Sequence, residues 1–398
     1  MAAAAELARA GRKVLVLEAR ERVGGRCWTR RMAGLEIPVE LGAEFIHGEA
    51  KATHALLRRA RIRAVDSTRE QRALERGRLR PINAFAEAQR AVQGIHLVED
   101  VSFAALLHRR ELPQRTKTFA QLMVQGFDAA DPARVSAHSI LQEWGEGGSL
   151  GASQPRPQGG YGALMDWLAG RLVRHGARLR MHSPVSAVKW QRGRVVVSVP
   201  SFSFEASKAI VTLPLGVLRS RAVRFAPALS NKRTALQSLA SGPVVRVAMR
   251  FHSPFWETRA PGVAFFHVPE AAFPTFWTPL PMRAPVLTAW AGGPKAARLT
   301  GASRERLLKR ALESVQRVFG PRAANPLDDA YVQDWQADPY ARGGYSYVLV
   351  GGAGAREELA APLEETLYFA GEATDAEEAG TVAGALRSGQ RAAREVLG

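Results

Sequence analysis

The sequence predicts an α/β fold, and three stretches carry that prediction. Each contains a short, continuously apolar run that is typical of a buried parallel strand, and two of the runs adjoin a helix-forming segment. The runs lie at 13–17, after a helix at 2–10; at 209–213, before Pro214; and at 366–370, before a helix at 381–397. We therefore expect a layer of parallel strands between layers of helices.

The first stretch is typical of the second half of a βαβ unit, since a helix ends at Gly11 and Lys13-Val-Leu-Val-Leu17 is closed by Glu18. An acid at this strand end can accept hydrogen bonds from the two hydroxyls of an adenosine ribose. Alone, Glu18 would more often be a surface carboxylate. Gly24-Gly25 would let backbone amides approach a pyrophosphate, with a plain turn as the alternative, and Arg26 supplies charge. The combination favours the ribose role of Glu18 over a surface carboxylate.

The middle of the chain mixes helical and strand patterns. Residues 52–143 have mostly helical spacing, and the apolar residues within the dense arginine stretch at 58–80 recur at about helical spacing. A solvated helical face is therefore favoured there over a nucleic-acid surface. We expect a helix at 161–175, strands at 178–181, 185–190 and 194–199, a β-sheet within 244–290, and a helix at 304–319.

Composition excludes several classes of protein. The 398 residues are 46% hydrophobic, enough for two domains, and the 55 basic against 37 acidic residues give a net charge of +18. The single cysteine, Cys27, excludes an intramolecular disulfide framework, and no third ligand accompanies His47 and His54, so we expect no metal. No apolar run reaches the roughly 20 residues of a membrane-spanning helix. We expect a soluble, cytoplasmic protein without a membrane partner.

A series of segments, in order along nearly the whole chain, resembles the flavin-containing amine oxidases. That family includes monoamine oxidases, polyamine oxidases and lysine-specific histone demethylases. The segments are Val14-Leu-Val-Leu-Glu18 through Gly24-Gly-Arg26, Glu40-Leu-Gly-Ala-Glu-Phe-Ile-His-Gly48, Val211-Thr-Leu-Pro-Leu-Gly-Val-Leu218, Trp335 through Tyr347, Phe369-Ala-Gly-Glu-Ala-Thr374 and Gly380-Thr-Val-Ala-Gly-Ala-Leu386.

The resemblance implies two domains and a flavin cofactor. A Rossmann-like FAD-binding domain of three layers would comprise residues 1–51, 160–220 and 325–398, and an α+β substrate domain would comprise 52–159 and 221–324. FAD would be held non-covalently. The activity would be oxidation of a small-molecule amine to an imine by oxygen, which becomes hydrogen peroxide. Sequence alone makes no prediction of the oligomeric state.

The resemblance also assigns roles to single residues. Glu18 would bind the adenosine ribose and Arg20 and Arg26 the neighbouring ribose or pyrophosphate. Gly42 and Ala43 would pass close to the flavin ring, Val185 would contact the adenine through its backbone, and Glu372 would approach the ribityl-phosphate region. Thr381 and Val382 would approach the flavin pyrimidine at a helix N-terminus, which favours negative charge. The remaining expected cofactor contacts are Gly24, Gly25, Trp335 and Gly371, and the expected catalytic residues are Tyr345, Arg246 and Thr381.

Three departures from the family pattern stand out. Gly344 lies where monoamine oxidases attach the flavin to a cysteine, which is why a non-covalent cofactor is expected. Arg246 replaces the lysine that holds a water near the flavin in much of the family, and a guanidinium cannot relay protons. The G-x-G-x-x-G loop should lie roughly 20 residues before the ribose acid, upstream of Met1. With that first strand missing, we expect this chain to bind FAD poorly and an upstream extension to restore binding.

Some alternatives stay open at this point. Phe265, Phe266, Phe276, Trp277 and Trp290 could form either the amine pocket or the core of a sheet. A related flavin oxidase acting on a non-amine, such as a porphyrinogen or carotenoid, is a second candidate function. A third is an FAD-free remnant that acts as a basic interaction protein.

Overall fold

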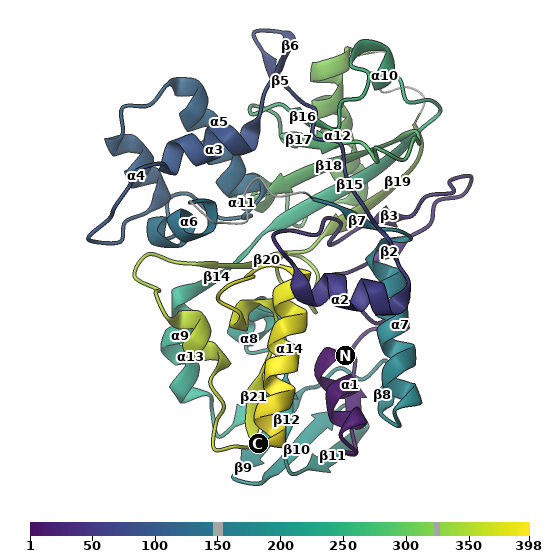
Figure 1. Ribbon diagram of the computed structural model, residues 1–398, viewed down its shortest axis with the longest axis vertical. Coiled ribbons are helices and arrows are strands. Elements are labelled where there is room, and N and C mark those ends of the chain that lie inside the picture. The colour runs from purple at the N-terminus through teal and green to yellow at the C-terminus, as the bar shows by residue number, and fades with distance from the viewer. Residues whose placement is uncertain (146–153, 322–326) are drawn as a thin grey trace.

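The computed structural model describes residues 1–145, 154–321 and 327–398. Two pairs of parallel strands lie in its lower half (Figure 1), which confirms the α/β class. Strand β1 (Leu15–Leu17) pairs with β8 (Arg178–Arg180), and β12 (Ala209–Val211) pairs with β21 (Leu367–Phe369). Among the described residues, no strand is hydrogen-bonded to the other edge of β1 or of β21. Each apolar run expected from the sequence is a short strand here.

Three helices accompany these strands: α1 (Ala2–Arg9), α7 (Gly160–Arg174) and α14 (Val382–Leu397). Helix α1 packs directly against α14, where Ala3 and Leu7 join Ala393 in one buried cluster. The approach is close, because a Cβ at Gly389 would lie 3.3 Å from the Ala3 nitrogen. The alanine-rich composition of α1 therefore serves close helix packing as well as helix propensity.

A four-stranded sheet completes the lower half of the molecule in Figure 1. The expected strands at 185–190 and 194–199 correspond to its two central strands. Its order is β11 (Phe202–Ala206), β10 (Arg194–Val199), β9 (Ala187–Gln191) and β13 (Arg224–Ala226).

A seven-stranded sheet forms the centre of the upper half and confirms the β-sheet expected within 244–290. Helix α12 (Arg304–Phe319) packs on it through Phe319, whose ring lies 5.1 Å from that of Phe266. The strand order is β19 (Leu327–Asp334), β15 (Val244–Phe251), β18 (Val286–Gly292), β17 (Thr275–Trp277), β16 (Phe265–His267), β5 (Gln71–Glu75) and β6 (Arg78–Pro81).

A group of helices lies beside this sheet, at the left of Figure 1. The helices share a core that includes Phe103, Phe119 and Trp144. They are α3 (Ala84–Val92), α4 (Phe103–Arg109), α5 (Gln114–Gly126) and α6 (Ala137–Trp144).

Shorter elements connect these layers. The β14–β20 pair lies between the two halves in Figure 1. The helices are α2 (Lys51–Ala60), α8 (Leu215–Ser220), α9 (Arg233–Ser238), α10 (Trp256–Arg259), α11 (Gly293–Ala297) and α13 (Ala355–Ala360), with 3₁₀ turns η1 (Ser230–Lys232) and η2 (Glu372–Thr374); the strands are β2 (Thr29–Arg30), β3 (Val39–Glu40), β4 (Ala64–Val65), β7 (Arg156–Pro157), β14 (Leu239–Gly242) and β20 (Tyr345–Val348).

The arginine-rich stretch differs from the expectation. A solvated helical face was expected within 58–80, but α2 ends at Ala60 and a hairpin of β5 and β6 follows at the edge of the seven-stranded sheet. Parallel pairing of β5 with β16 decides this, because alternate residues such as Gln71 and Ala73 become buried.

The expected boundary at residue 325 placed β19 with the cofactor domain, yet β19 pairs along its length with β15 of the large sheet. The division of the chain into two domains stays a prediction. No helix within the described ranges is both long and apolar enough to cross a membrane.

Candidate active site

A cavity of about 1470 Å³ runs between the parallel strands and the seven-stranded sheet. Every residue that the sequence analysis assigned to cofactor binding or catalysis lies on its wall, although the role of each stays a prediction. These residues are Glu18, Arg20, Gly24, Gly25, Arg26, Gly42, Ala43, Val185, Arg246, Trp335, Tyr345, Gly371, Glu372, Thr381 and Val382. Segments more than 300 residues apart in the chain therefore form one chamber.

Glu18 lies at the carboxyl end of β1, directly after Leu17. Its Oε1 accepts the backbone N–H of Arg20 at 2.9 Å. The Arg20 side chain turns to Asp338, with Nη2 2.5 Å from Oδ1, and its guanidinium lies 5.2 Å from the centre of the Tyr340 ring. Arg20 thus has a carboxylate partner of its own, which the sequence analysis did not identify.

The glycines on this wall are required by the geometry of the chain. Gly24 has φ +97°, and a Cβ there would lie 2.6 Å from the carbonyl oxygen of Cys27. At Gly42 a Cβ would lie 1.7 Å from the carbonyl oxygen of Arg26, which bonds the N–H of Ala43 at 3.0 Å. Small residues at these positions keep the backbone close to the cavity.

A buried ion cluster surrounds Glu372, which lies in η2 and is 5% exposed. Its Oε1 accepts from Nη1 of Arg26 at 3.0 Å and its Oε2 accepts from the hydroxyl of Ser346 at 2.6 Å. Burial by itself raises the pKa of Glu372, but the guanidiniums of Arg26 and Arg356 outweigh it and hold the pKa below its usual range. The Arg26 guanidinium, on the cavity wall beside Glu372, is a charged donor of the kind that binds a phosphate group.

A second buried ion cluster surrounds Arg246, which lies on β15 and is 1% exposed. Its guanidinium pairs with Oε2 of Glu44 and donates from Nη1 to the carbonyl oxygen of Gly42 at 2.8 Å. Glu44 also accepts from Nε of Arg156 at 2.7 Å and from Nε1 of Trp277 at 2.9 Å. Burial would raise the pKa of Glu44, and the two arginines instead lower it. Arg246 is thus a fixed charge beneath the Gly42 turn.

The sequence analysis missed Glu44, which lines the cavity, and Arg156, which bonds Glu44 from outside the cavity lining. Glu44 stands within the quoted segment 40–48, so its place in that motif was an available signal. Arg156 lies 112 residues further along the chain, and nothing in the local pattern indicates that it meets Glu44.

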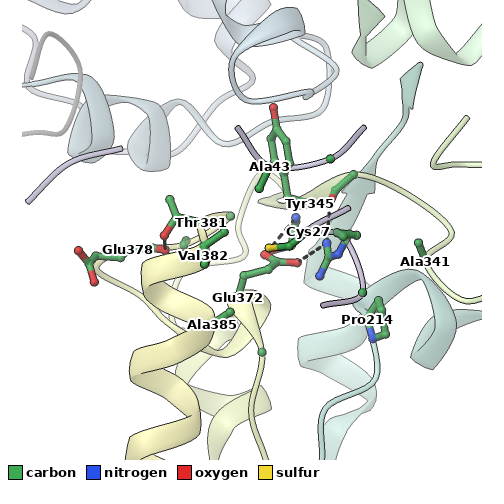
Figure 2. Close-up of a pocket in the computed structure, with 18 of the residues that line it drawn as sticks. Cys27, Ala43, Pro214, Ala341, Tyr345, Glu372, Glu378, Thr381, Val382 and Ala385 are labelled. Carbon is green, nitrogen blue, oxygen red and sulfur yellow. Dashed lines mark hydrogen bonds and ion pairs between the residues drawn. The ribbon is translucent and has the colours of Figure 1, made fainter. Parts of the chain in front are cut away.

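Tyr345 and the first turn of α14 face the cavity together. Figure 2 shows the side chains of Thr381 and Val382 at the first turn of the helix, with those of Tyr345 and Glu372 beside them. The Tyr345 hydroxyl donates to the carbonyl oxygen of Phe127, and Thr381 Oγ1 caps the helix by accepting the Gly384 N–H at 3.0 Å. Burial, followed by nearby carboxylates, raises the pKa of Tyr345 well above its usual range, so the phenol is neutral.

Because successive residues of a strand point to opposite faces, the five aromatic residues noted in the sequence fall into two environments. Phe265, Trp277 and Trp290 line the cavity, whereas Phe266 and Phe276 are fully buried in the core beneath α12. His47 also lines the cavity, and burial lowers its pKa to about 4, so the ring is neutral at pH 7. Among the described residues no cluster of three His, Cys, Asp or Glu side chains is arranged to hold a metal ion.

The arrangement can bind an extended, partly anionic cofactor and a smaller apolar molecule in one chamber. Positive charge gathers around Glu372 and around Glu44, glycines allow a flat group to approach the backbone at Gly42, and aromatic rings enclose the far end. Such a chamber excludes water from a reacting centre.

Comparison with known proteins finds one matching family and several related proteins. A family described as flavin-containing amine oxidoreductase matches residues 1–397. Human lysine-specific histone demethylase 2 is 26% identical over 100% of this chain and 52% of its own length. Polyamine oxidase 3 from rice (Oryza sativa subsp. japonica) is 29% identical over 99% of the chain and 86% of its own length. The chain thus spans about half the length of the demethylase.

Solved structures share the fold. Wild-type putrescine oxidase bound to putrescine superposes with a TM-score of 0.82, at 24% identity, covering 100% of this chain and 96% of that one. Cyclohexylamine oxidase from Brevibacterium oxydans has a TM-score of 0.81 at 20% identity, covering 99% and 96%. At these sequence identities, the structural similarity shows a shared fold alone.

Proposed function

Because the chain belongs to the flavin-containing amine oxidoreductases, we propose that it oxidises a small-molecule amine to an imine with oxygen as the acceptor. The amine gives up two electrons and two protons, oxygen takes them to become hydrogen peroxide, and water hydrolyses the imine to a carbonyl compound. One observation carries the proposal: the expected cofactor contacts and the aromatic pocket belong to a single cavity.

The cofactor is FAD held without a covalent bond, and the described residues fit it. Glu18 closes a parallel strand as a ribose acid does, and the Arg26 guanidinium on the cavity wall would donate to a phosphate. Open space lies beside Gly25 and Gly371, where a Cβ would meet no atom within 4 Å. FAD bound there would supply the acceptor for the hydride equivalent that leaves the carbon next to the amine nitrogen.

The chain's own residues would then position the amine and exclude water. The ring of Tyr345, fixed through its hydroxyl to the carbonyl of Phe127, would orient the substrate together with Phe265 and Trp277, which are paired on the neighbouring strands β16 and β17. Burial among these rings favours the neutral amine, which is the reactive form. The N-terminus of α14 and the fixed charge of Arg246 favour negative charge that develops on the cofactor.

The test is a flavin absorbance spectrum of the purified protein, followed by a peroxide-coupled assay over a panel of primary and secondary amines. Because this chain is expected to bind FAD poorly, FAD is supplied in excess, and we then expect a flavin spectrum and peroxide formation with at least one amine. FAD-loaded protein that is not reduced by any amine without oxygen would contradict the amine oxidation. Flavin reduction without peroxide formation on admitting air would contradict oxygen as acceptor. The cytoplasmic location also stays a prediction, which fractionation of the source cells would test.

A further inference from the structure

A group of uncharged polar side chains lies on the face of the seven-stranded sheet that forms part of the cavity wall. Gln71, His267 and Thr275 come from the neighbouring strands β5, β16 and β17, and all three line the cavity. The amine oxidation described above gives none of them a part. Gln71 is 6% exposed and His267 is 5% exposed, so their polar atoms lie inside the protein rather than at its outer surface.

Strand pairing places this polar group beside the aromatic part of the cavity. Thr275 is the direct partner of His267 on β16 and of Trp290 on β18. Directly paired residues point to the same face of a sheet, and neighbouring strands lie about 4.8 Å apart. His267 is therefore about 10 Å, two strand spacings, from Trp290. Trp290 donates from Nε1 to the carbonyl of Gly126 at 2.8 Å, next to the carbonyl that the Tyr345 hydroxyl bonds. The polar group thus lies to one side of the place expected for the amine.

The hydrogen bonds determine the state of the His267 ring. Oε1 of Gln71 lies 3.1 Å from the backbone nitrogen of Ala84, which can only donate, so this atom is the amide oxygen. The same oxygen lies 3.1 Å from Nε2 of His267, which must therefore carry the proton. Nδ1 of the ring is then an acceptor, 3.4 Å from the hydroxyl of Thr275. Burial alone lowers the pKa of His267 to about 4, so the ring is uncharged at neutral pH.

These contacts leave two hydrogen-bonding groups unused. The side-chain nitrogen of Gln71 donates to no described residue, and the Thr275 oxygen, which donates to the ring, accepts from none. Within the described ranges, no charged side chain is hydrogen-bonded to any of the three residues, so a charged ligand group would be buried without a counter-charge. An apolar ligand group would leave the Gln71 N–H groups unpaired. A group that both accepts and donates a hydrogen bond, as a hydroxyl does, avoids both costs.

We propose that Gln71, His267 and Thr275 form a specificity site for a hydroxyl group at the end of the substrate away from the amine. This inference rests on the proposed amine oxidation and concerns the part of the substrate that does not react. The hydroxyl would accept from the Gln71 amide and donate to the Thr275 oxygen, while His267 holds both side chains in place. Phe265 and Trp277, paired on the same two strands as His267 and Thr275, would contact the carbon chain between the two ends.

The experiment uses three amines of equal length that differ only in the terminal group: 5-amino-1-pentanol, 1-hexylamine and 1,5-diaminopentane. A chain of five carbons spans between one and two strand spacings. The parent, Thr275→Val, Gln71→Glu and the control Thr278→Val are assayed with FAD in excess. Thr275→Val removes the hydroxyl with little change of shape, so we expect it to fold. Thr278 is a buried threonine outside the cavity lining, and its hydroxyl bonds the carbonyl of Val263.

We expect the parent to prefer the amino alcohol to each of the other amines at least tenfold in kcat/KM. 1-Hexylamine leaves the polar groups unpaired, and 1,5-diaminopentane adds a charge without a partner. Thr275→Val should reduce the preference over 1-hexylamine to less than threefold, mainly through KM, whereas Thr278→Val should keep it. Gln71→Glu retains the acceptor for Ala84 and His267 and adds a negative charge, so it should improve 1,5-diaminopentane at least tenfold relative to the amino alcohol.

Equal efficiency of the amino alcohol and 1-hexylamine in the parent, or a preference for the diamine, would overturn the inference and leave the amine oxidation intact. Equal losses for all three amines in Thr275→Val would do the same. Thermal unfolding with each amine measures binding without turnover. A rise in Tm with the amino alcohol alone, without oxidation of any of the three, would uphold the site and contradict the proposed function. Neither binding nor oxidation would overturn both.

Discussion

At the scale of single residues, Glu40 shows how burial changes an acid. It lies at the end of β3, accepts the Tyr161 N–H at 2.6 Å and bonds the Thr29 hydroxyl at 2.9 Å. Burial, outweighing these two hydrogen bonds, raises its pKa from 4.5 to about 7; the charge of Glu44 adds to the rise and that of Arg246 opposes it. The carboxyl therefore holds its proton more tightly in the folded protein than in the unfolded chain.

The sign of the pH dependence follows from this difference. Between about pH 4.5 and 7 the folded state keeps a proton that the unfolded state loses, so Glu40 makes the free energy of unfolding fall as pH rises. The slope is at most roughly 1.4 kcal/mol per pH unit. We predict that Glu40→Gln will be more stable than the parent at pH 8, with a smaller gain at pH 5, by urea unfolding.

The comparison with Glu40→Gln isolates this one group. Burial lowers the pKa values of His47 and His267 to about 4, so as the pH falls the unfolded chain takes up these protons before the folded protein does. These two residues therefore make the free energy of unfolding rise with pH, opposite to Glu40. Their contribution is the same in both proteins and cancels from the difference. An advantage of the variant that does not change between pH 5 and pH 8 would refute the assignment to Glu40.

Glu18 offers a second test at this scale. We predict that Glu18→Ala will weaken FAD binding by about tenfold or more, because hydrogen bonds from ribose hydroxyls to a charged acceptor contribute roughly 1.5–3 kcal/mol each. Titration of the FAD-free protein with FAD measures the effect. The matched control is Glu21→Ala, which changes an exposed acid three residues away and should leave the affinity unchanged. Equal affinities for the two variants would make Glu18 a surface carboxylate.

Tyr345 tests the substrate side of the cavity. We predict that Tyr345→Ala will lower the rate of amine oxidation more than the FAD content, since the ring is expected to orient the substrate. Tyr345→Phe keeps the ring and removes only the hydrogen bond to the Phe127 carbonyl, so it should retain more activity than the alanine variant. Turnover is measured together with the ratio of flavin to protein. Unchanged turnover in Tyr345→Ala would mean that the ring does not orient the amine.

At the scale of elements, the first turn of α14 shows how a cap shapes the site. Thr381 accepts the Gly384 N–H and donates to the Glu378 carbonyl oxygen at 2.6 Å, which fixes the entry of the chain into a 16-residue helix. A Cβ at Gly384 would lie 2.1 Å from the same Glu378 oxygen, so the turn is tightly packed. The cap thereby sets the direction in which the helix N-terminus faces the cavity.

We predict that Thr381→Ala will lower the free energy of unfolding by about 0.5–2 kcal/mol, the usual cost of losing an N-cap. Thr381→Ser, which keeps the hydroxyl, should stay close to the parent. Urea unfolding of the three proteins, each saturated with FAD, provides the measurement. A serine variant as unstable as the alanine variant would assign the loss to the methyl group rather than to the cap.

At the scale of the whole molecule, the cavity joins the two halves, so a bound cofactor should stabilise the entire fold. FAD in 100-fold excess over its dissociation constant adds about 2.7 kcal/mol when only the folded state binds it. We predict a rise in Tm with FAD concentration and complete release of FAD on denaturation. Gly344 occupies the position at which a cysteine would bind the flavin covalently. A cysteine side chain does not fit there, because a Cβ would lie 2.6 Å from Cγ2 of Val244. Flavin that stays with acid-precipitated protein would contradict the non-covalent cofactor.

The sequence by itself determined the helices and strands whose buried residues follow a local pattern along the chain. The strand at 194–199 and the helix at 304–319 have the expected bounds, and the runs around 209–213 and 366–370 form parallel strands. These predictions depend on whether one face or both faces of a local element are buried, and periodic or continuous apolar residues record that directly. The motifs that follow one another along the chain likewise indicated which residues line the cavity. An acid at a strand end and a glycine turn can each be recognised from a few consecutive residues.

Only the tertiary structure decided which charges meet. Arg246 and Glu44 are 202 residues apart, and Asp128 and Glu143 are neighbours only because α5 and α6 both pack against α3. The hairpin at 71–81 formed for a similar reason, since pairing with β16 outweighed the helical spacing of its apolar residues. The choice of an ion-pair partner or of a sheet edge depends on contacts between distant segments, and the free energy of those contacts leaves no periodic trace in the sequence.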